Sequence, residues 1–160
     1  MKINPKNISQ EAFEFLKEIE CFYEVPTKIN GVLYTGYGFN FYENGDPITS
    51  ADLPLSKKYA SKYLRNLLKP YEACVGSAID IRISQSQFDA LVLLCYDIGI
   101  KQFLRSKLLK KINTSEDPIE LYHDWIVYGR HEAQLNYGMA RMREVEYHLY
   151  ITSEINPNLW

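Results

Sequence analysis

Apolar residues near the start of the chain recur at the spacing of a helix. Ser9 before this stretch and Glu11 just inside it are typical of a helix N-cap followed by an acidic first turn. Because proline disrupts a helix interior, Pro26 is expected to end this helix or the stretch of chain just after it. The apolar positions that define the buried face are Ala12, Phe13, Leu16 and Ile19.

The pattern changes over residues 27–49, where glycines alternate with large apolar and aromatic side chains. Short apolar runs bounded by glycine are typical of strands joined by tight turns. The Asn44-Gly45 pair predicts a hairpin turn, because both residues adopt positive φ easily. The apolar positions of this stretch are Val32, Leu33, Tyr34, Tyr37, Phe39 and Phe41.

From Leu55 onward the pattern is helical throughout. We expect helices over residues 56–75, 84–98, 102–112, 117–127 and 138–150. Phe88, Leu91, Val92 and Cys95 would form the buried face of the second of these, and Gly99 fits the left-handed position after its end. The predicted fold class is therefore α+β, with a β-hairpin lobe at 27–49 and a larger helical lobe at 55–150 of one domain, 1–160.

Composition narrows the class of protein. The chain has 160 residues, of which 46% are hydrophobic and 24% charged, which excludes disordered, collagen-like and coiled-coil proteins. A formal net charge of -2 provides no overall attraction to nucleic acid or to an anionic membrane. The sequence contains no signal-peptide pattern and no apolar run of membrane-spanning length, so we expect a cytoplasmic protein.

No metal or cofactor site is predicted. Cys21, Cys74 and Cys95 are widely spaced and form no Cys-x-x-Cys pair, so we interpret them as reduced and structural. Tyr122-His123-Asp124 is not accompanied by a nucleophile elbow or a second histidine at ligand spacing. The sequence also lacks a glycine-rich phosphate loop that leads into a helix.

Two charged clusters have a functional and a structural interpretation. Arg141 and Arg143 could bind an anionic polymer of sugar and peptide, but the nearby Glu144 and Glu146 favour a solvated lattice of charges on a helix. The basic stretch at 57–69, interleaved with tyrosines, could contact nucleic acid or an acidic partner. A solvated helix face is the interpretation that we favour there as well.

Several segments, in order along the chain, resemble the phage-type lysozymes, the endolysins that cut bacterial peptidoglycan. The resemblance covers roughly residues 10–150 and implies a lysozyme-like fold with a cleft between its two lobes. The matching segments are residues 15–20, 36–38, 83–99, 103–113 and 138–146, together with Trp125 and Gly129.

The resemblance places the family's general acid at Glu20. Glycoside cleavage needs an acid that protonates the leaving oxygen, and usually a second carboxylate that activates water or attacks the sugar. In the family the acid is a glutamate at the end of the first helix, and Glu20 follows Leu16 and Ile19 in the matching phase. Glu18 is a shifted alternative that matches the apolar pattern less well.

Other functional positions of the family are altered. The family's aspartate falls at Thr27 or Lys28, and neither can act as a carboxylate base. Its threonine on the first hairpin strand falls at Tyr34. The histidine after the Gly-Tyr-Gly stretch is replaced by Phe39, and the glycine after the acid by Cys21. These departures favour an altered or lost chemistry on a preserved scaffold.

Three other acids could supply the second carboxylate, namely Glu24, Glu43 and Asp46. A separation of about 6.5–9.5 Å between the two carboxyl groups would favour an inverting mechanism, and about 5–5.5 Å a retaining one. The resemblance also places substrate contacts at Asn40, Tyr96 and Ser106. For Tyr96 and Ser106, packing or capping between helices is an equal alternative.

Two hypotheses on function follow. In the first, the protein is a muramidase that hydrolyses the β-1,4 glycan of peptidoglycan, with Glu20 as general acid and an altered second group. In the second, it is a catalytically inactive lysozyme fold that binds a cell-wall fragment or another protein. A muramidase made in the cytoplasm would need a separate pore to reach the wall.

Overall fold

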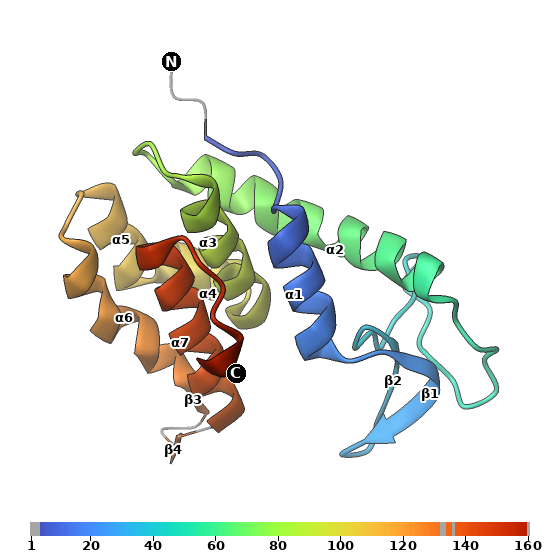
Figure 1. Cartoon of the computed structure of the whole chain (residues 1–160). Coiled ribbons are helices and arrows are strands. Elements are labelled where there is room, and N and C mark those ends of the chain that lie inside the picture. Colours follow the sequence, from blue (N-terminus) through green and yellow to red (C-terminus); the bar gives the residue numbers. More distant parts are fainter. Residues whose placement is uncertain (1–3, 132–133, 136, 160) are drawn as a thin grey trace. The chain divides into compact units, whose positions relative to one another are not determined.

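The computed structural model describes residues 4–131, 134–135 and 137–159 (Figure 1). The chain forms two compact units, one of residues 13–69 and one of residues 1–12 and 70–160. The first unit groups the hairpin with most of the first helix and the start of the second. This division differs from the predicted lobes 27–49 and 55–150, and the predicted cleft between lobes stays a prediction.

Helix α1 (Gln10–Glu20) begins where the sequence predicts it, because Ser9 Oγ accepts a hydrogen bond from Ala12 N at 3.1 Å. Of the two alternatives for Pro26, the end of the helix itself is wrong. The helix ends six residues earlier, at Glu20, because Cys21 adopts a left-handed conformation with φ 55°. Pro26 lies instead inside strand β1 (Tyr23–Ile29), and a strand of a two-stranded sheet has an open edge that tolerates proline.

Strands β1 and β2 (Val32–Gly36) form an antiparallel hairpin. Its turn is at Asn30 and Gly31, which both have positive φ as the hairpin twist requires. The Asn44-Gly45 pair also forms a tight turn, with Gly45 at φ +87°. That turn is flanked by the isolated bridge Phe41↔Pro47 rather than by regular strands, so the predicted second hairpin is reduced to a closed loop.

Helix α2 (Lys57–Ala78) follows this loop and begins at Ser56, whose Oγ accepts from Tyr59 N at 3.1 Å. Ala60, Leu64 and Leu68 form its buried side within residues 13–69. The prediction of a helix over 56–75 is confirmed, with an end three residues further on.

The second unit is helical and is built around α3 (Gln85–Ile98), which packs along α7 (Tyr137–Thr152) (Figure 1). A capping box between Ser84 and Gln87 starts α3, and Gly99 follows it at φ +89°. The predicted apolar face is confirmed, since Phe88, Leu91 and Val92 are fully buried.

The predicted helix over 102–112 is in fact two helices, α4 (Ile100–Arg105) and α5 (Lys107–Asn113). Ser106 separates them in an extended conformation, and its Oγ accepts a hydrogen bond from Leu109 N at 3.0 Å as the N-cap of α5. The predicted helix over 117–127 is likewise divided into η1 (Pro118–Leu121), α6 (Tyr122–Ile126) and η2 (Val127–Gly129). The short strands β3 (Arg130–His131) and β4 (Gln134–Leu135) precede α7, and η3 (Pro157–Leu159) follows it.

The expectation of a solvated charge lattice around Arg143 is wrong. Arg143 and Glu146 have no exposed surface. The guanidinium donates to both carboxylate oxygens of Glu146 at 2.6 and 2.7 Å and to Asp97 Oδ2 at 2.7 Å. Trp125 Nε1 completes the shell of Glu146 at 3.0 Å. Burial is tolerated because each charge has a hydrogen-bonded counter-charge.

The first described residues belong to the helical unit. The backbone N–H of Ile8 donates to Glu72 Oε1 at 2.8 Å, and that of Ser9 donates to Asp89 Oδ1 at 2.9 Å. Both carboxylates are buried, so these hydrogen bonds satisfy acidic groups that would otherwise be costly to bury. Within the described part of the chain, no helix has both the length and the apolar character needed to cross a membrane.

Candidate functional site

Glu20 occupies the last position of α1 and is half-buried. Its carboxylate lies against the turn that follows β2: a β-carbon built on Gly38 would be 2.9 Å from Glu20 Oε2. Gly38 also has φ +76°, which disfavours any side chain. The turn and the acid are therefore closely fitted, and a side chain at position 38 would displace the carboxylate.

The turn beneath Glu20 is held in place on both sides. Thr35 and Phe39 exchange two backbone hydrogen bonds of 2.9 Å. The buried ring of Tyr37 packs against Phe22, with the ring centroids 5.4 Å apart. Phe39, which the resemblance places at the family's histidine, is 4% exposed and packs on Tyr63 with centroids 4.3 Å apart. It fills the core and offers no group for proton transfer.

The register of the hairpin distinguishes Thr27 from Lys28. Thr27 is the direct partner of Tyr34, and Lys28 is the direct partner of Leu33. Partners across an antiparallel ladder lie on the same face, and successive residues on opposite faces. Thr27 therefore shares a face with Tyr34, whereas Lys28 lies on the other face. If the family's aspartate and threonine act together, Thr27 is the position that matches the aspartate.

Thr35, next to Tyr34, carries the side chain that the resemblance places at position 34, but its role is different. Its side chain is 1% exposed, and its Oγ1 donates to the carbonyl of Tyr23 at 3.3 Å. It lies on the face opposite Tyr34, where it ties β2 to the start of β1.

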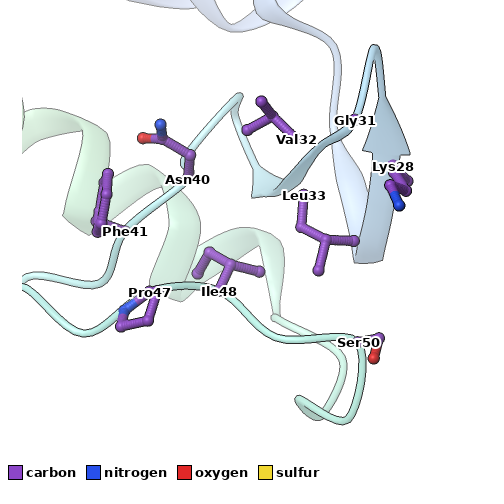
Figure 2. A pocket seen from close by; sticks show the side chains of 9 residues that line it. All are labelled: Lys28, Gly31, Val32, Leu33, Asn40, Phe41, Pro47, Ile48 and Ser50. Carbon is purple, nitrogen blue, oxygen red and sulfur yellow. The ribbon is translucent and has the colours of Figure 1, made fainter.

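Asn40, a predicted substrate contact, lines a pocket of about 410 Å³ between the hairpin and the loop of residues 40–50 (Figure 2). Leu33 and Ile48 form apolar parts of its wall, and Lys28 is the one charged residue among those that line it. Of these wall residues, Lys28 and Leu33 share the face of the hairpin opposite Thr27 and Tyr34.

The three replacement acids are all exposed but differ in their partners. Glu43 Oε1 accepts from Asn66 Nδ2 at 2.7 Å, and Asp46 Oδ2 accepts from Asn44 Nδ2 at 2.7 Å. The carboxylate of Glu24, on β1, has no hydrogen bond or ion pair with any residue that the structure describes. Of the three, Glu24 is thus the carboxylate whose oxygens are not engaged by another side chain.

Tyr96 and Ser106 lie in the helical unit. The Tyr96 ring meets the Tyr71 ring edge-on, with centroids 5.2 Å apart, and Tyr96 is half-buried. Ser106 is 3% exposed, and its hydroxyl accepts the capping bond of α5. A packing role for Tyr96 and a capping role for Ser106 are thus present, and their contact with substrate stays a prediction.

The sequence predicts Glu20 as the general acid, which stays a prediction, and does not predict its approach to Gly38. The Gly36-Tyr37-Gly38 spacing indicated a turn, and the approach of the carboxylate to Gly38 appears only once α1 is packed on that turn. Across the described residues, no group of three or more His, Cys, Asp or Glu side chains is placed to hold a metal ion.

Comparison with known proteins shows the same scaffold. The chain is 26% identical over 153 residues to an endolysin of Bacillus phage B103, a match that covers 92% of the chain and 55% of that relative. It is 29% identical over 111 residues to an endolysin of Bacillus phage PZA, over 66% of the chain and 40% of the relative. The chain thus spans about half the length of the curated relatives it matches.

Two solved structures share the fold over almost the whole chain. An endolysin from Escherichia coli O157:H7 phage FAHEc1 superposes with a TM-score of 0.85 at 22% identity, over 94% of this chain and 96% of that one. The muramidase domain of SpmX from Asticaccaulis excentricus gives a TM-score of 0.77 at 24% identity, over 92% and 99%. Identities this low show the fold alone.

The model of the family described as "Phage lysozyme" matches residues 17–146 of the chain. That match extends from the helix that carries Glu20 to the buried Glu146, and the structure has the expected hairpin and helical body. The chain therefore belongs to the phage lysozyme family.

Proposed function

We propose that the protein is a muramidase that hydrolyses the β-1,4 glycan of peptidoglycan, with Glu20 as the general acid. The observation that carries the proposal is the fit between Glu20 and Gly38, which fixes one carboxylate at the end of α1. Its family relatives include endolysins, and one solved structure of the same fold is a muramidase domain.

In this proposal the protonated Glu20 donates its proton to the glycosidic oxygen as the bond from that oxygen to the sugar's anomeric carbon breaks. Water then adds to the anomeric carbon, and its proton passes to a second base. Neither Thr27 nor Tyr34 has a carboxylate that could accept that proton. Glu24 is the replacement that we favour, because its carboxylate is exposed and not engaged by another described side chain.

The site of action would be the bacterial wall, which a protein made in the cytoplasm would reach through a separate pore. No metal or cofactor is required by this mechanism, because a carboxylic acid supplies the proton directly.

The test is the loss of turbidity of chloroform-permeabilised Gram-negative cells, together with the release of reducing sugar from purified peptidoglycan. Wild type should be active, Glu20→Gln inactive, and Glu18→Gln active, since Glu18 is the neighbouring exposed acid on the same helix. Loss of activity in Glu24→Gln but not in Glu43→Gln or Asp46→Asn would assign the second carboxylate.

The altered Thr27, Lys28 and Tyr34 positions favour one alternative, a catalytically inactive protein that binds a cell-wall fragment or another protein. No release of reducing sugar by folded wild type would contradict the muramidase. If such an inactive protein sediments with purified peptidoglycan, it is a cell-wall-binding protein. If it stays in the supernatant, a protein partner is the alternative to test.

A further inference from the structure

Asp97, near the end of α3, has a carboxylate that is fixed on one side and open on the other. Its Oδ2 accepts a hydrogen bond from Nη2 of Arg143 at 2.7 Å, and Arg143 has no exposed surface. The side chain of Asp97 is nevertheless 42% exposed. Its Oδ1 accepts no hydrogen bond from the described part of the chain. One oxygen is thus held from inside the helical unit, and the other is open to an external donor.

Arg143 has a counter-charge without Asp97. Its guanidinium donates to both carboxylate oxygens of Glu146, from Nε at 2.7 Å and from Nη2 at 2.6 Å. Its Nη1 also donates to the carbonyl oxygen of Tyr128 at 3.4 Å. The cluster of Arg143, Glu146 and Asp97 therefore contains one positive and two negative charges. The excess negative charge is at Asp97, the exposed member of the cluster.

Position 97 is an unfavourable place for an anion. Asp97 is the last residue but one of α3, the last turn of the helix contains no basic residue, and the C-terminal end of a helix dipole repels negative charge. Burial raises the pKa of Glu146, and the charge of Asp97 adds to that rise. An asparagine would give Arg143 an acceptor without either effect. A carboxylate kept at this position indicates a hydrogen-bond donor outside the chain.

The surroundings of Asp97 indicate where that donor comes from. Asp97 directly follows Tyr96, which the resemblance places among the substrate contacts. The residues that follow Asp97 line a pocket of about 410 Å³, formed by Ile98, Gly99, Lys101, Gln102 and Arg105. In sequence, Asp97 thus stands between a predicted sugar contact and a hollow of the surface.

We propose that Asp97 binds a hydroxyl group of the peptidoglycan glycan through the carboxylate oxygen that Arg143 leaves open. A carboxylate held by a buried guanidinium is pre-organised as an acceptor, and hydrogen bonds to ionised acceptors are stronger than those between neutral groups. A sugar ring presents several hydroxyl donors and needs no charge of its own. The choice of a glycan rests on the proposed function. Arg143 is a positioning residue, which acts through Asp97.

The test measures the binding of tetra-N-acetylchitotetraose, a neutral β-1,4-linked sugar, to the Glu20→Gln protein by titration calorimetry. Glu20→Gln should bind the sugar saturably and without cleavage. Glu20→Gln/Asp97→Ala should bind it about tenfold more weakly or worse, the loss expected for a hydrogen bond to a charged group. Asp97→Asn in the same background keeps an acceptor without the charge, and its affinity should fall between the other two.

The matched control is Asp124→Ala, which breaks an ion pair of equal length in the same helical unit, Lys111 to Asp124 at 2.7 Å. In the Glu20→Gln background it should bind the sugar as tightly as the parent does. Equal loss in Asp124→Ala and Asp97→Ala would overturn the proposal in favour of a general effect on the fold. Unchanged binding in Asp97→Ala, or no binding by the Glu20→Gln parent, would also overturn it.

Two further measurements separate a glycan contact from other roles of Asp97. Asp97→Ala leaves the pair of Arg143 and Glu146 intact, so its melting temperature should be close to that of its parent. Intact peptidoglycan also contains amino groups on its stem peptides. If Asp97→Ala loses affinity for intact peptidoglycan but binds the tetrasaccharide as its parent does, the carboxylate binds such an amine, and the glycan contact is overturned.

This proposal and the muramidase can fail independently, because sugar binding is measured without catalysis. Release of reducing sugar by wild type, with unchanged sugar binding in the Asp97→Ala protein, would overturn the Asp97 contact and leave the muramidase intact. Weaker binding in the Asp97→Ala protein, without release of reducing sugar by wild type, would do the reverse. If both proposals hold, Asp97→Ala in the otherwise wild-type chain should raise KM and leave kcat nearly unchanged.

Discussion

A β-carbon added to Gly38 would lie 2.9 Å from Oε2 of Glu20, at a backbone φ of +76°. Gly38→Ala is therefore expected to destabilise the protein in two ways, by left-handed backbone strain of about 1–2 kcal/mol and by a steric clash with the carboxylate. We expect a lower free energy of unfolding in urea and, if the proposed muramidase uses Glu20 as its acid, a lower lytic rate, because Glu20 must move to make room.

Gly45 offers the matched control, because it has φ +87° and no atom within 4 Å of the added carbon. Gly45→Ala should show the strain without the clash. In a Glu20→Ala background the additional destabilisation of Gly38→Ala over Gly45→Ala should disappear. If the two alanine variants are equally stable in the wild-type background, the close fit has no energetic consequence.

The pairing of Thr27 with Tyr34 predicts which reconstruction of the site succeeds. Thr27→Asp/Tyr34→Thr would place on one face of the hairpin the aspartate and the threonine that the resemblance assigns to the family's site. General-base catalysis contributes about 10²–10⁴-fold, so in a Glu24→Gln background, which lacks the base favoured in the proposed function, the lytic rate should rise toward that factor. Lys28→Asp/Tyr34→Thr places the carboxylate on the other face and should leave the rate unchanged. Equal gains from both pairs would contradict the role assigned to the register.

Cys21 is a non-glycine residue at φ 55°, directly after the end of α1. Glycine adopts this region without the steric cost that a β-carbon imposes. Cys21→Gly should therefore raise the free energy of unfolding by about 1 kcal/mol. Cys21→Ala retains the β-carbon and should give no such gain. A urea titration that finds the two variants equally stable would show that the thiol, rather than the backbone, governs stability here.

Substitutions of Arg143 and Glu146, which are buried as a pair, are expected to have non-additive effects on the free energy of unfolding. Arg143→Met leaves the Glu146 carboxylate buried without its main counter-charge and should cost about 3–5 kcal/mol. Glu146→Gln in the same chain removes that charge and keeps an acceptor for Trp125 Nε1. The double variant should be more stable than Arg143→Met alone. A double variant less stable than the single one would mean that the charges are not balanced against each other.

The buried thiols of Cys74 and Cys95 are expected to make the free energy of unfolding depend on pH. Burial raises the pKa of the Cys95 thiol and that of Cys74, so the native state keeps both protonated at a pH where the unfolded chain ionises them. Their contribution to stability is complete below about pH 8.5, the ordinary thiol pKa, and is lost as pH rises above it. The free energy of unfolding should fall between pH 8.5 and 10 by up to about 1.4 kcal/mol per pH unit for the Cys95 thiol, and Cys74 should add to the fall in the same direction.

Cys74→Ala/Cys95→Ala should be less stable at neutral pH but should show a shallower fall over that range. Native protein should react with Ellman's reagent at the exposed Cys21, and at all three cysteines only in denaturant. Rapid reaction of all three in the native state would contradict the burial of the pair.

The helical body could be predicted from the sequence because its apolar periodicity is local. The faces of α1 and α3 and the N-cap at Ser9 follow from residues within a few positions. The break at Ser106 was not foreseen, because the apolar pattern continues through it and only the capping bond to Leu109 reveals it. The position of the hairpin was also predicted incorrectly, because a turn signal does not show which strands pair. Asn44-Gly45 does form a turn, but the paired strands lie on either side of Asn30 and Gly31.

The error at Arg143 has a different origin. Its neighbours in sequence, Arg141 and Glu144, are typical of a solvated helix face, whereas its partner Asp97 is 46 residues away. A buried charge is identified only by the packing that brings such a partner to it. The place of Glu20 at the end of α1 could be predicted because its position relative to Leu16 and Ile19 is local, whereas its approach to Gly38 could not, because it is not local.

The hydrogen bonds from Ile8 and Ser9 to Glu72 and Asp89 join residues 64 and 80 positions apart. The helical unit is therefore discontinuous in sequence, with residues 13–69 inserted into it. On a ribosome, the inserted unit is complete when residue 69 has emerged, while the N-terminal segment must still wait for α3. Shortening or tagging that segment would thus affect the late-synthesised helices 60 or more residues away, and not the hairpin that follows it directly.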